Sequence, residues 1–272
     1  MIRRISIKSN SGGGARRPPI WRTVIVLAVL AINPARASEV HVFAAASTTK
    51  PVADILQLYE QQTNANATPV FGASGALARQ IDQGAPADIY LSASPRWMDW
   101  LEKRKRLVSG TRRDLMGNCL VLIQPQAAAA FSPLMQNSAE FLKMKRFVVG
   151  DPAYVPAGEY AVTALKRLDL WSAIASRAAR MPSVRHVLFL IERREADAGF
   201  VYRSDALSSA RVHIAEKIDS NLHDEIVYPV AMIKQPDASN ITQRLYNFLT
   251  TAAALAVFER YGFRLLEKKC SD

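Results

Sequence analysis

The sequence predicts an α/β protein with two lobes built on mostly parallel sheets. Short apolar runs rich in β-branched and aromatic residues alternate with longer stretches whose apolar residues recur at helical spacing, the pattern of parallel strands joined by helices. About 235 residues follow an N-terminal leader, a length that favours two lobes over one. Two long apolar runs, 115–123 and 227–233, can carry the chain from one lobe to the other.

The first 37 residues have the three-part layout of a secretory signal. Seven Lys and Arg and no acid are followed by the apolar run Thr23 to Ile32 and the small-x-small site Ala35-Arg36-Ala37. The run is shorter than the roughly 20 residues that span a bilayer, so we favour a cleaved signal over a retained anchor. We therefore expect a periplasmic protein, and the pairs Arg3-Arg4 and Arg16-Arg17 leave both the Sec and the twin-arginine routes open.

Most of the positive charge belongs to this leader. The whole chain has 35 Lys and Arg against 24 Asp and Glu, but only 28 of those cations lie beyond residue 37. The mature chain therefore has a net charge of +4 instead of +11, which gives no reason to expect nucleic acid as a partner. The main basic run left, 103–106, fits a helix C-terminus better than a docking surface.

Strand-to-helix units fill the first half of the mature chain. Each of three predicted strands leads into a helix: 40–44, 68–71 and 88–91. Pro51 belongs in the first turn of its helix, so the cap is Thr48 or Thr49, and the third helix begins near Pro95. The run 115–123 is continuously apolar, as one strand buried on both faces would be.

The second half repeats this alternation. Strands are expected at 147–149, 199–202, 212–214 and 227–233, and helices at 156–170, from Ser183 onward, at 241–251 and at 253–261. The two crossing runs put both chain ends in one lobe and the middle in the other. We assign 38–117 with 230–272 to lobe 1 and 118–229 to lobe 2, with the ligand cleft between them, where strand ends and helix N-termini converge.

One stretch, residues 150–158, has the strongest functional pattern. A short strand ends at Gly150 and Pro152, which force a turn, and Pro156 then suits the first position of a helix because its missing N–H would be unpaired there. The N–H groups of Ala157 and Gly158 follow with almost no side chain to keep a ligand away. A bare helix N-terminus of this kind is a site for an anion.

Signs of enzyme chemistry are sparse. The four histidines have no ligand spacing, the two cysteines are far apart, and no nucleophile elbow or phosphate-binding glycine loop occurs. Ser74 lies between glycines without the elbow spacing, which keeps a serine hydrolase only as an alternative. Asp151 beside Pro152 fits a turn residue better than a general base. We expect no catalytic residue, no bound metal cation and no cofactor.

The two cysteines, Cys119 and Cys270, would meet an oxidising compartment after export. Cys119 lies in an apolar run and Cys270 is third from the end. From the sequence we favour a buried free thiol and a free tail thiol, with a disulfide between them as the alternative.

Hydroxyl or small residues follow several predicted strands. Ser47, Ser74, Ala157 and the helix start at Ser183-Val184 each stand at such a junction. Alone, each is an ordinary helix cap, but if they converge they surround a small volume with donors only. A tetrahedral dianion without a proton suits such a pocket. A phosphate that retains a proton would need an acceptor, whereas sulfate could be rejected only by pocket size.

The motifs together resemble one family, the periplasmic molybdate-binding proteins of ABC importers. The segments that carry the resemblance are Phe43-Ala44-Ala45-Ala46-Ser47, Leu77-Ala78-Arg79-Gln80, Gly84-Ala85-Pro86-Ala87-Asp88, Gly150-Asp151-Pro152 with Val155-Pro156-Ala157-Gly158, and Gly199-Phe200-Val201-Tyr202-Arg203-Ser204-Asp205-Ala206. Their order and spacing cover about Val40 to Phe263. The resemblance implies a two-lobed type II periplasmic binding fold with the ligand between the lobes.

The resemblance also implies the ligand and its contacts. Hydroxyl and N–H groups of Ser47 and Ser74, N–H groups of Ala157 and Val184, and the hydroxyl of Tyr202 would bind molybdate, or tungstate alongside it. Molybdenum would be held only as its oxyanion, without direct ligands to the metal. The expected protein is a monomeric, non-enzymatic receptor that delivers the anion to the permease of an ABC importer.

Three residues depart from the family pattern. Gly75 stands where a serine is frequent, which removes a donor or loosens the turn, and Ser94 replaces a frequent acid and is expected at the surface. His186 follows Val184 by two residues. It is either a protonatable group that strengthens anion binding as pH falls below about 6.5 or a helix-face residue clear of the ligand.

Other functions remain open at this point. Within the same class, the ligand could be sulfate or an organic sulfonate. From other classes, the alternatives are the secreted hydrolase using Ser74 or Ser47 and an effector-sensing regulatory domain. No DNA-binding helix pair precedes the predicted fold in this sequence, whereas a signal does, which disfavours the regulatory domain.

Overall fold

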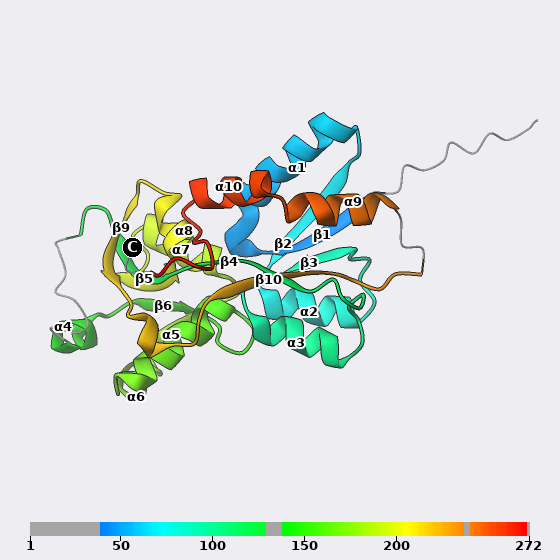
Figure 1. Cartoon of the computed structure of the whole chain (residues 1–272). Coiled ribbons are helices and arrows are strands. Elements are labelled where there is room, and N and C mark those ends of the chain that lie inside the picture. The colour runs from blue at the N-terminus through cyan, green and yellow to red at the C-terminus, as the bar shows by residue number, and fades with distance from the viewer. Residues whose placement is uncertain (1–38, 129–137, 237–239, 271–272) are drawn as a thin grey trace, which may run out of the picture. The chain divides into compact units, whose positions relative to one another are not determined.

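The computed structural model describes residues 39–128, 138–236 and 240–270, which form two five-stranded sheets with helices on their faces (Figure 1). The first sheet contains β1 (Val40–Ala45), β2 (Ala67–Gly72), β3 (Ile89–Leu91), β4 (Arg113–Gly117) and β10 (Val227–Met232). The second contains β5 (Leu120–Pro125), β6 (Phe147–Gly150), β7 (Ala178–Met181), β8 (Ala198–Tyr202) and β9 (Val212–Lys217). Their orders, β2-β1-β3-β10-β4 and β7-β6-β8-β5-β9, follow the same plan.

Each sheet is mixed, with a single reversed strand. In the first sheet β2, β1 and β3 are parallel, and β10 is antiparallel to β3 and β4. In the second, β7, β6 and β8 are parallel, and β5 is antiparallel to β8 and β9. The reversed strands are those that arrive directly from the other sheet, without the helical crossover that parallel neighbours need. The predicted mostly parallel α/β architecture is confirmed.

The prediction of one strand over 115–123 is wrong. β4 ends at Gly117 and β5 begins at Leu120, so Asn118 and Cys119 carry the chain from the first sheet to the second. The N–H of Gly117 donates to the carbonyl of Arg264 at 2.7 Å, and the N–H of Arg264 donates back to the carbonyl of Gly117 at 2.9 Å. Gly117 and Asn118 mark the break in the sequence, but the side chains on both sides of it are buried, so the run looks like a single buried strand.

Helices cover both faces of each sheet. They are α1 (Thr49–Thr63), α2 (Ser74–Asp82), α3 (Pro95–Lys103), α4 (Ser138–Lys143), α5 (Pro156–Arg167), α6 (Trp171–Ile174), α7 (Val184–Glu192), α8 (Arg203–Leu207), α9 (Asn240–Leu249) and α10 (Ala252–Arg260), with 3₁₀ turns η1 (Ala46–Thr48) and η2 (Ser220–Leu222). On the first sheet, α1, α9 and α10 lie on one face and α2 and α3 on the other (Figure 1). Sequence periodicity missed β7, α4, α6 and α8, which are short.

The helices begin at the capping and proline residues that the sequence predicts. Thr48 precedes α1 and Pro51 lies in its first turn, as expected. Ser183 caps α7, its side chain accepting from the N–H of His186. A separate apolar cluster fixes α2 and α3 against β3 and β10 through Leu77 and Trp97. The remaining helices and both sheets share one continuous core.

The first sheet takes its strands from both ends of the described chain, and the second takes its strands from the middle. The proposed lobe division, 38–117 with 230–272 against 118–229, stays a prediction; its second boundary falls inside β10. The predicted signal, 1–37, lies outside the described residues. Among the helices that are described, none has the length and apolarity needed to cross a membrane.

The cysteines are joined, contrary to the free thiols favoured from the sequence. A disulfide links Cys119 to Cys270 across 151 residues of sequence. The C-terminal segment reaches Cys119 because Arg264 pairs with the backbone of Gly117, two residues before it. Nothing in the spacing of the cysteines indicates the course of that tail, so the sequence alone could not settle the pairing. The bond fastens the tail to the crossing between the sheets.

Candidate functional site

The five residues predicted to bind the ligand all line one small cavity: Ser47, Ser74, Ala157, Val184 and Tyr202. The other lining residues are Ala, Gly, Val and Pro, so no described residue of the lining carries a charge. Even with space open to solvent included, the cavity is about 210 Å³. Pockets for drug-sized ligands are about 300–1,000 Å³. The space therefore suits a small ion.

Each of the five residues stands where a strand ends. Ser47 lies in η1 directly after β1, and Ser74 opens α2 after β2. Ala157 is the second residue of α5, Val184 the first of α7, and Tyr202 the last of β8. Since β1 and β2 are parallel, and so are β7, β6 and β8, their carboxyl ends share one edge of each sheet. This is the edge where open α/β sheets place ligands.

The helix starts supply unpaired N–H groups. N–H groups in a first helical turn have no acceptor within their own helix. Among the described residues, the backbone hydrogen bonds outside helices and strands also use none of the N–H groups of Ser74, Ala157 and Val184. α2, α5 and α7 thus each bring a positive dipole end to the cavity. An anion there is favoured without Lys or Arg.

Each of the two serine hydroxyls has one hydrogen-bond partner that fixes its position. Ser74 Oγ accepts a hydrogen bond from the N–H of Ala93 at 2.9 Å. Ser47 Oγ lies 2.9 Å from Tyr228 Oη, in a bond that either hydroxyl could donate. Both serines are buried, so these bonds fix the position of each oxygen at the cavity wall.

The Tyr202 hydroxyl has no partner. It is buried, and no acceptor or donor among the described residues reaches it. Burial raises the pKa of Tyr202 well above its ordinary value, with the neighbouring Tyr228 contributing. The phenol therefore keeps its proton and can donate it. A buried polar atom without a partner costs free energy unless a ligand pairs with it.

The turn before α5 depends on close backbone contact. A Cβ built on Gly158 would lie 1.8 Å from the carbonyl oxygen of Gly150, so only glycine lets the helix start this near to the end of β6. Asp151 is a turn residue, as predicted: its Oδ1 accepts from the N–H of Ala153 at 3.0 Å. Its backbone carbonyl accepts from the N–H of Val155.

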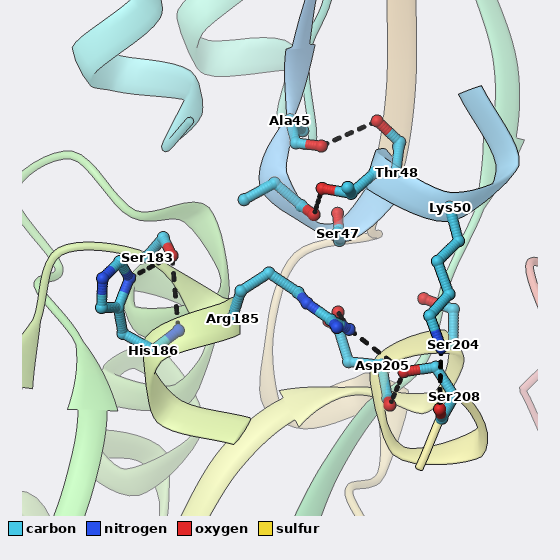
Figure 2. Close-up of polar contacts among 12 residues, drawn as sticks. Ala45, Ser47, Thr48, Lys50, Ser183, Arg185, His186, Ser204, Asp205 and Ser208 are labelled. Carbon is cyan, nitrogen blue, oxygen red and sulfur yellow. Dashed lines mark hydrogen bonds and ion pairs between the residues drawn. The ribbon is translucent and has the colours of Figure 1, made fainter. Parts of the chain in front are cut away.

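Elements of the two sheets touch around the cavity. The N–H of Gly75 donates to the carbonyl of Tyr154 at 3.0 Å, and Lys50 Nζ donates to the carbonyl of Ser208 at 3.0 Å (Figure 2). A Cβ at Gly75 would lie 2.4 Å from the Trp97 ring and 2.8 Å from the Tyr154 oxygen. The glycine that departs from the family pattern therefore permits this approach, and does not merely loosen a turn.

The other two departures are also placed. Ser94 is buried, not at the surface as expected, and caps α3 by accepting from the N–H of Arg96 at 3.2 Å. His186 is exposed, and its Nδ1 lies 2.8 Å from Ser183 Oγ. Figure 2 shows it pointing away from Arg185, which reaches Asp205 instead. His186 is not part of the cavity wall, which fits the helix-face alternative.

Sequence reasoning missed Ala93 in the cavity wall and Tyr228 and Asn118 behind it. These residues contact the site serines directly or through one neighbour. Tyr228 and Asn118 lie in or beside the apolar crossing runs, where a polar contact has no pattern of its own.

The geometry does not support hydrolysis at the serines. The hydrogen-bond partners of Ser47 and Ser74 are Tyr228 and the backbone of Ala93, so no described histidine acts on either hydroxyl. Within the described ranges, no three His, Cys, Asp or Glu side chains gather where they could hold a metal ion.

Comparison with known proteins gives consistent matches. The model of a family described as bacterial extracellular solute-binding protein matches residues 40–264. The molybdate-binding protein ModA of Escherichia coli is 36% identical over 230 residues, 84% of this chain and 89% of its own. ModA of Haemophilus influenzae is 38% identical over 244 residues, 89% of this chain and 96% of its own. The solved Azotobacter vinelandii periplasmic molybdate-binding protein has a TM-score of 0.75 at 19% identity, covering 84% of this chain and 100% of its own, and shows the shared fold.

Proposed function

Because the chain belongs to the family of bacterial extracellular solute-binding proteins, we propose that it captures molybdate, and tungstate alongside it, for an ABC importer. The ligand would bind in the cavity lined by the five predicted residues. It would accept hydrogen bonds from the hydroxyls of Ser47, Ser74 and Tyr202 and from the N–H groups of Ala157 and Val184. The relatives named for molybdate support this ligand.

One observation carries the proposal: the cavity offers donors but no charge. Three helix N-termini and the unpartnered Tyr202 hydroxyl face a space without Lys, Arg, Asp or Glu in its described lining. A dianion with four acceptor oxygens satisfies such donors, and helix dipoles offset its charge. A positive side chain would instead favour anions in general.

The proposal also covers where the protein acts and with which partner. We propose export to the periplasm, delivery of the anion to permease subunits, and action as a monomer. No turnover and no cofactor are expected. The family of the chain and the names of its relatives support the receptor role.

Calorimetry with molybdate, tungstate, sulfate and hydrogen phosphate tests the ligand. We expect molybdate and tungstate to bind tightly, sulfate weakly and hydrogen phosphate more weakly still. A double variant, Ser47→Ala with Ser74→Ala, should lose most of the affinity, while Ser109→Ala, at an exposed loop serine, should bind like the wild type. Sulfate binding as tight as molybdate binding would show that the receptor serves another oxyanion. Turnover of an ester that disappears in the double variant would favour the hydrolase.

A further inference from the structure

We infer that Asn118 and Tyr228 set the direction of the Ser47 hydroxyl proton and thereby make the pocket reject oxyanions that carry a proton. The inference rests on the proposed function, because it concerns the choice among anions at that site. Neither residue lines the cavity itself, so both would be positioning residues behind a ligand-binding serine.

The first step is the orientation of the Asn118 amide. Its Oδ1 accepts from the N–H of Cys119 at 2.9 Å and from the N–H of Ser204 at 3.5 Å. Backbone N–H groups can only donate, so the oxygen must lie on that side. The Nδ2 group consequently faces the other way, towards Ser204 Oγ at 2.8 Å and Tyr228 Oη at 3.5 Å.

The second step is the direction of the Tyr228 hydroxyl. An amide N–H cannot accept a hydrogen bond, so the phenol oxygen receives the Asn118 proton. Among its described hydrogen-bond partners, Ser47 Oγ, 2.9 Å away, is then the only acceptor for the phenol's own proton. The ring cannot swing out of this position easily. It is fully buried and packs edge-on against Phe263 and Tyr202, with centroid distances of 5.3 and 5.8 Å.

The third step is the remaining proton of Ser47. Its oxygen already accepts from Tyr228, and no described residue accepts the Ser47 proton, which is therefore free for a ligand in the cavity that Ser47 lines. Ser74 has the same arrangement, and here the donor is certain: the N–H of Ala93 donates to Ser74 Oγ, which leaves the Ser74 proton for the ligand. Ser47 and Ser74 thus each direct a hydroxyl proton to the cavity, while the oxygen of each accepts a hydrogen bond from the protein, from Tyr228 and from the N–H of Ala93 respectively.

The consequence is selectivity by proton count. An unprotonated dianion accepts both serine protons. A hydrogen phosphate ion needs an acceptor for its own proton, which the Ser47 oxygen could supply only by turning its proton back towards Tyr228. That reversal would leave the phenol proton without an acceptor among its described partners, because Asn118 offers it only an N–H. Hydrogen bonds in a buried chain reinforce one another, so reversing the chain costs more than reversing one bond.

The test compares molybdate and hydrogen phosphate in mildly alkaline buffer, where both carry two negative charges. Any change in overall charge then cancels in the ratio of their affinities. In Asn118→Asp the new carboxylate only accepts, so it takes the Tyr228 proton, Tyr228 accepts from Ser47, and the Ser47 oxygen turns its lone pairs to the ligand. We expect this variant to lower the molybdate-to-phosphate ratio about tenfold, the worth of one buried hydrogen bond.

A second arm isolates the relay. Tyr228→Phe alone should weaken molybdate binding about threefold to tenfold, and in its background Asn118→Asp should no longer change the ratio. Tyr246→Phe, which removes a buried phenol bonded to the backbone of Thr111, is the matched control and should bind like the wild type. Thermal melts check that each variant folds; if Asn118→Asp does not, the Tyr228→Phe arm decides.

The outcomes separate the two claims. An unchanged ratio in Asn118→Asp, an equal change of the ratio in the Tyr228→Phe background, or wild-type molybdate affinity in Tyr228→Phe would each overturn the relay. In those cases tight molybdate binding by the wild-type protein would leave the proposed function standing. Wild-type protein that binds no molybdate would refute the proposed function itself.

Discussion

Replacement of Gly158 by alanine tests the link between the backbone turn and the ligand. The added Cβ would lie 1.8 Å from the Gly150 carbonyl oxygen, and contacts shorter than 3.0 Å are essentially never observed. The start of α5 and the end of β6 must therefore move apart by at least the difference, 1.2 Å. Overpacking of this kind costs about 1–3 kcal/mol or more, and the better helix propensity of alanine returns about 1 kcal/mol.

The effect on binding should exceed the effect on stability. The shift moves the N–H of Ala157, the preceding residue, by a distance that breaks a hydrogen bond to a charged ligand. Such a bond is worth about 1.5–3 kcal/mol, or about a tenfold to hundredfold loss of affinity. Urea denaturation followed by circular dichroism gives the stability, and calorimetry with molybdate gives the affinity.

The control is another glycine. Gly110 has φ +77° and nothing within 4 Å of a built Cβ, so Gly110→Ala should cost about 1–2 kcal/mol of stability through backbone strain and leave binding intact. Wild-type affinity in folded Gly158→Ala would refute the reasoning, because the backbone of the turn would then not hold the ligand.

Three further predictions concern the site, the tail and pH. Ser74→Ala should weaken molybdate binding by about 1.5–3 kcal/mol and also lower stability, because the buried N–H of Ala93 loses its acceptor; calorimetry and urea titration measure both, and an unchanged affinity would exclude Ser74 from the site. Cys119→Ser should lower the free energy of unfolding by about 2–5 kcal/mol, since the disulfide closes a long loop; a melting temperature equal to that of wild type without reductant would contradict a formed bond. Burial raises the pKa of Asp205 from 3.8 to about 6; as pH rises between these values the unfolded chain releases a proton that the folded chain keeps, so stability should fall by up to about 3 kcal/mol. Asp205→Asn should lack this fall, and parallel stability profiles of the two proteins would contradict the assignment.

The sequence predicts well wherever local chemistry decides the structure. Strand-to-helix junctions have short-range signals: Pro51, Pro95 and Pro156 occur in the first turns of their helices as expected, and Ser183 caps α7. Because parallel strands bring these junctions to one edge, the five predicted residues meet at one cavity. Their contact with a ligand remains a prediction.

Features that depend on distant parts of the chain were not predictable. The break between β4 and β5 follows from pairing of Gly117 with Arg264, far along the sequence. The disulfide depends on the same tail. Ser94 was expected at the surface, yet the helix that it caps packs against α2 and β10 in the interior. In each case a partner remote in sequence decides the outcome, and the local pattern is silent about it.

A crystal structure of the protein grown with molybdate tests the central claim most directly. The account predicts one anion whose oxygens lie about 2.7–3.1 Å from the hydroxyls of Ser47, Ser74 and Tyr202 and from the backbone nitrogens of Ala157 and Val184, with no Lys or Arg side chain in contact. An anion held elsewhere, or one neutralised by a cationic side chain in this cavity, would contradict it.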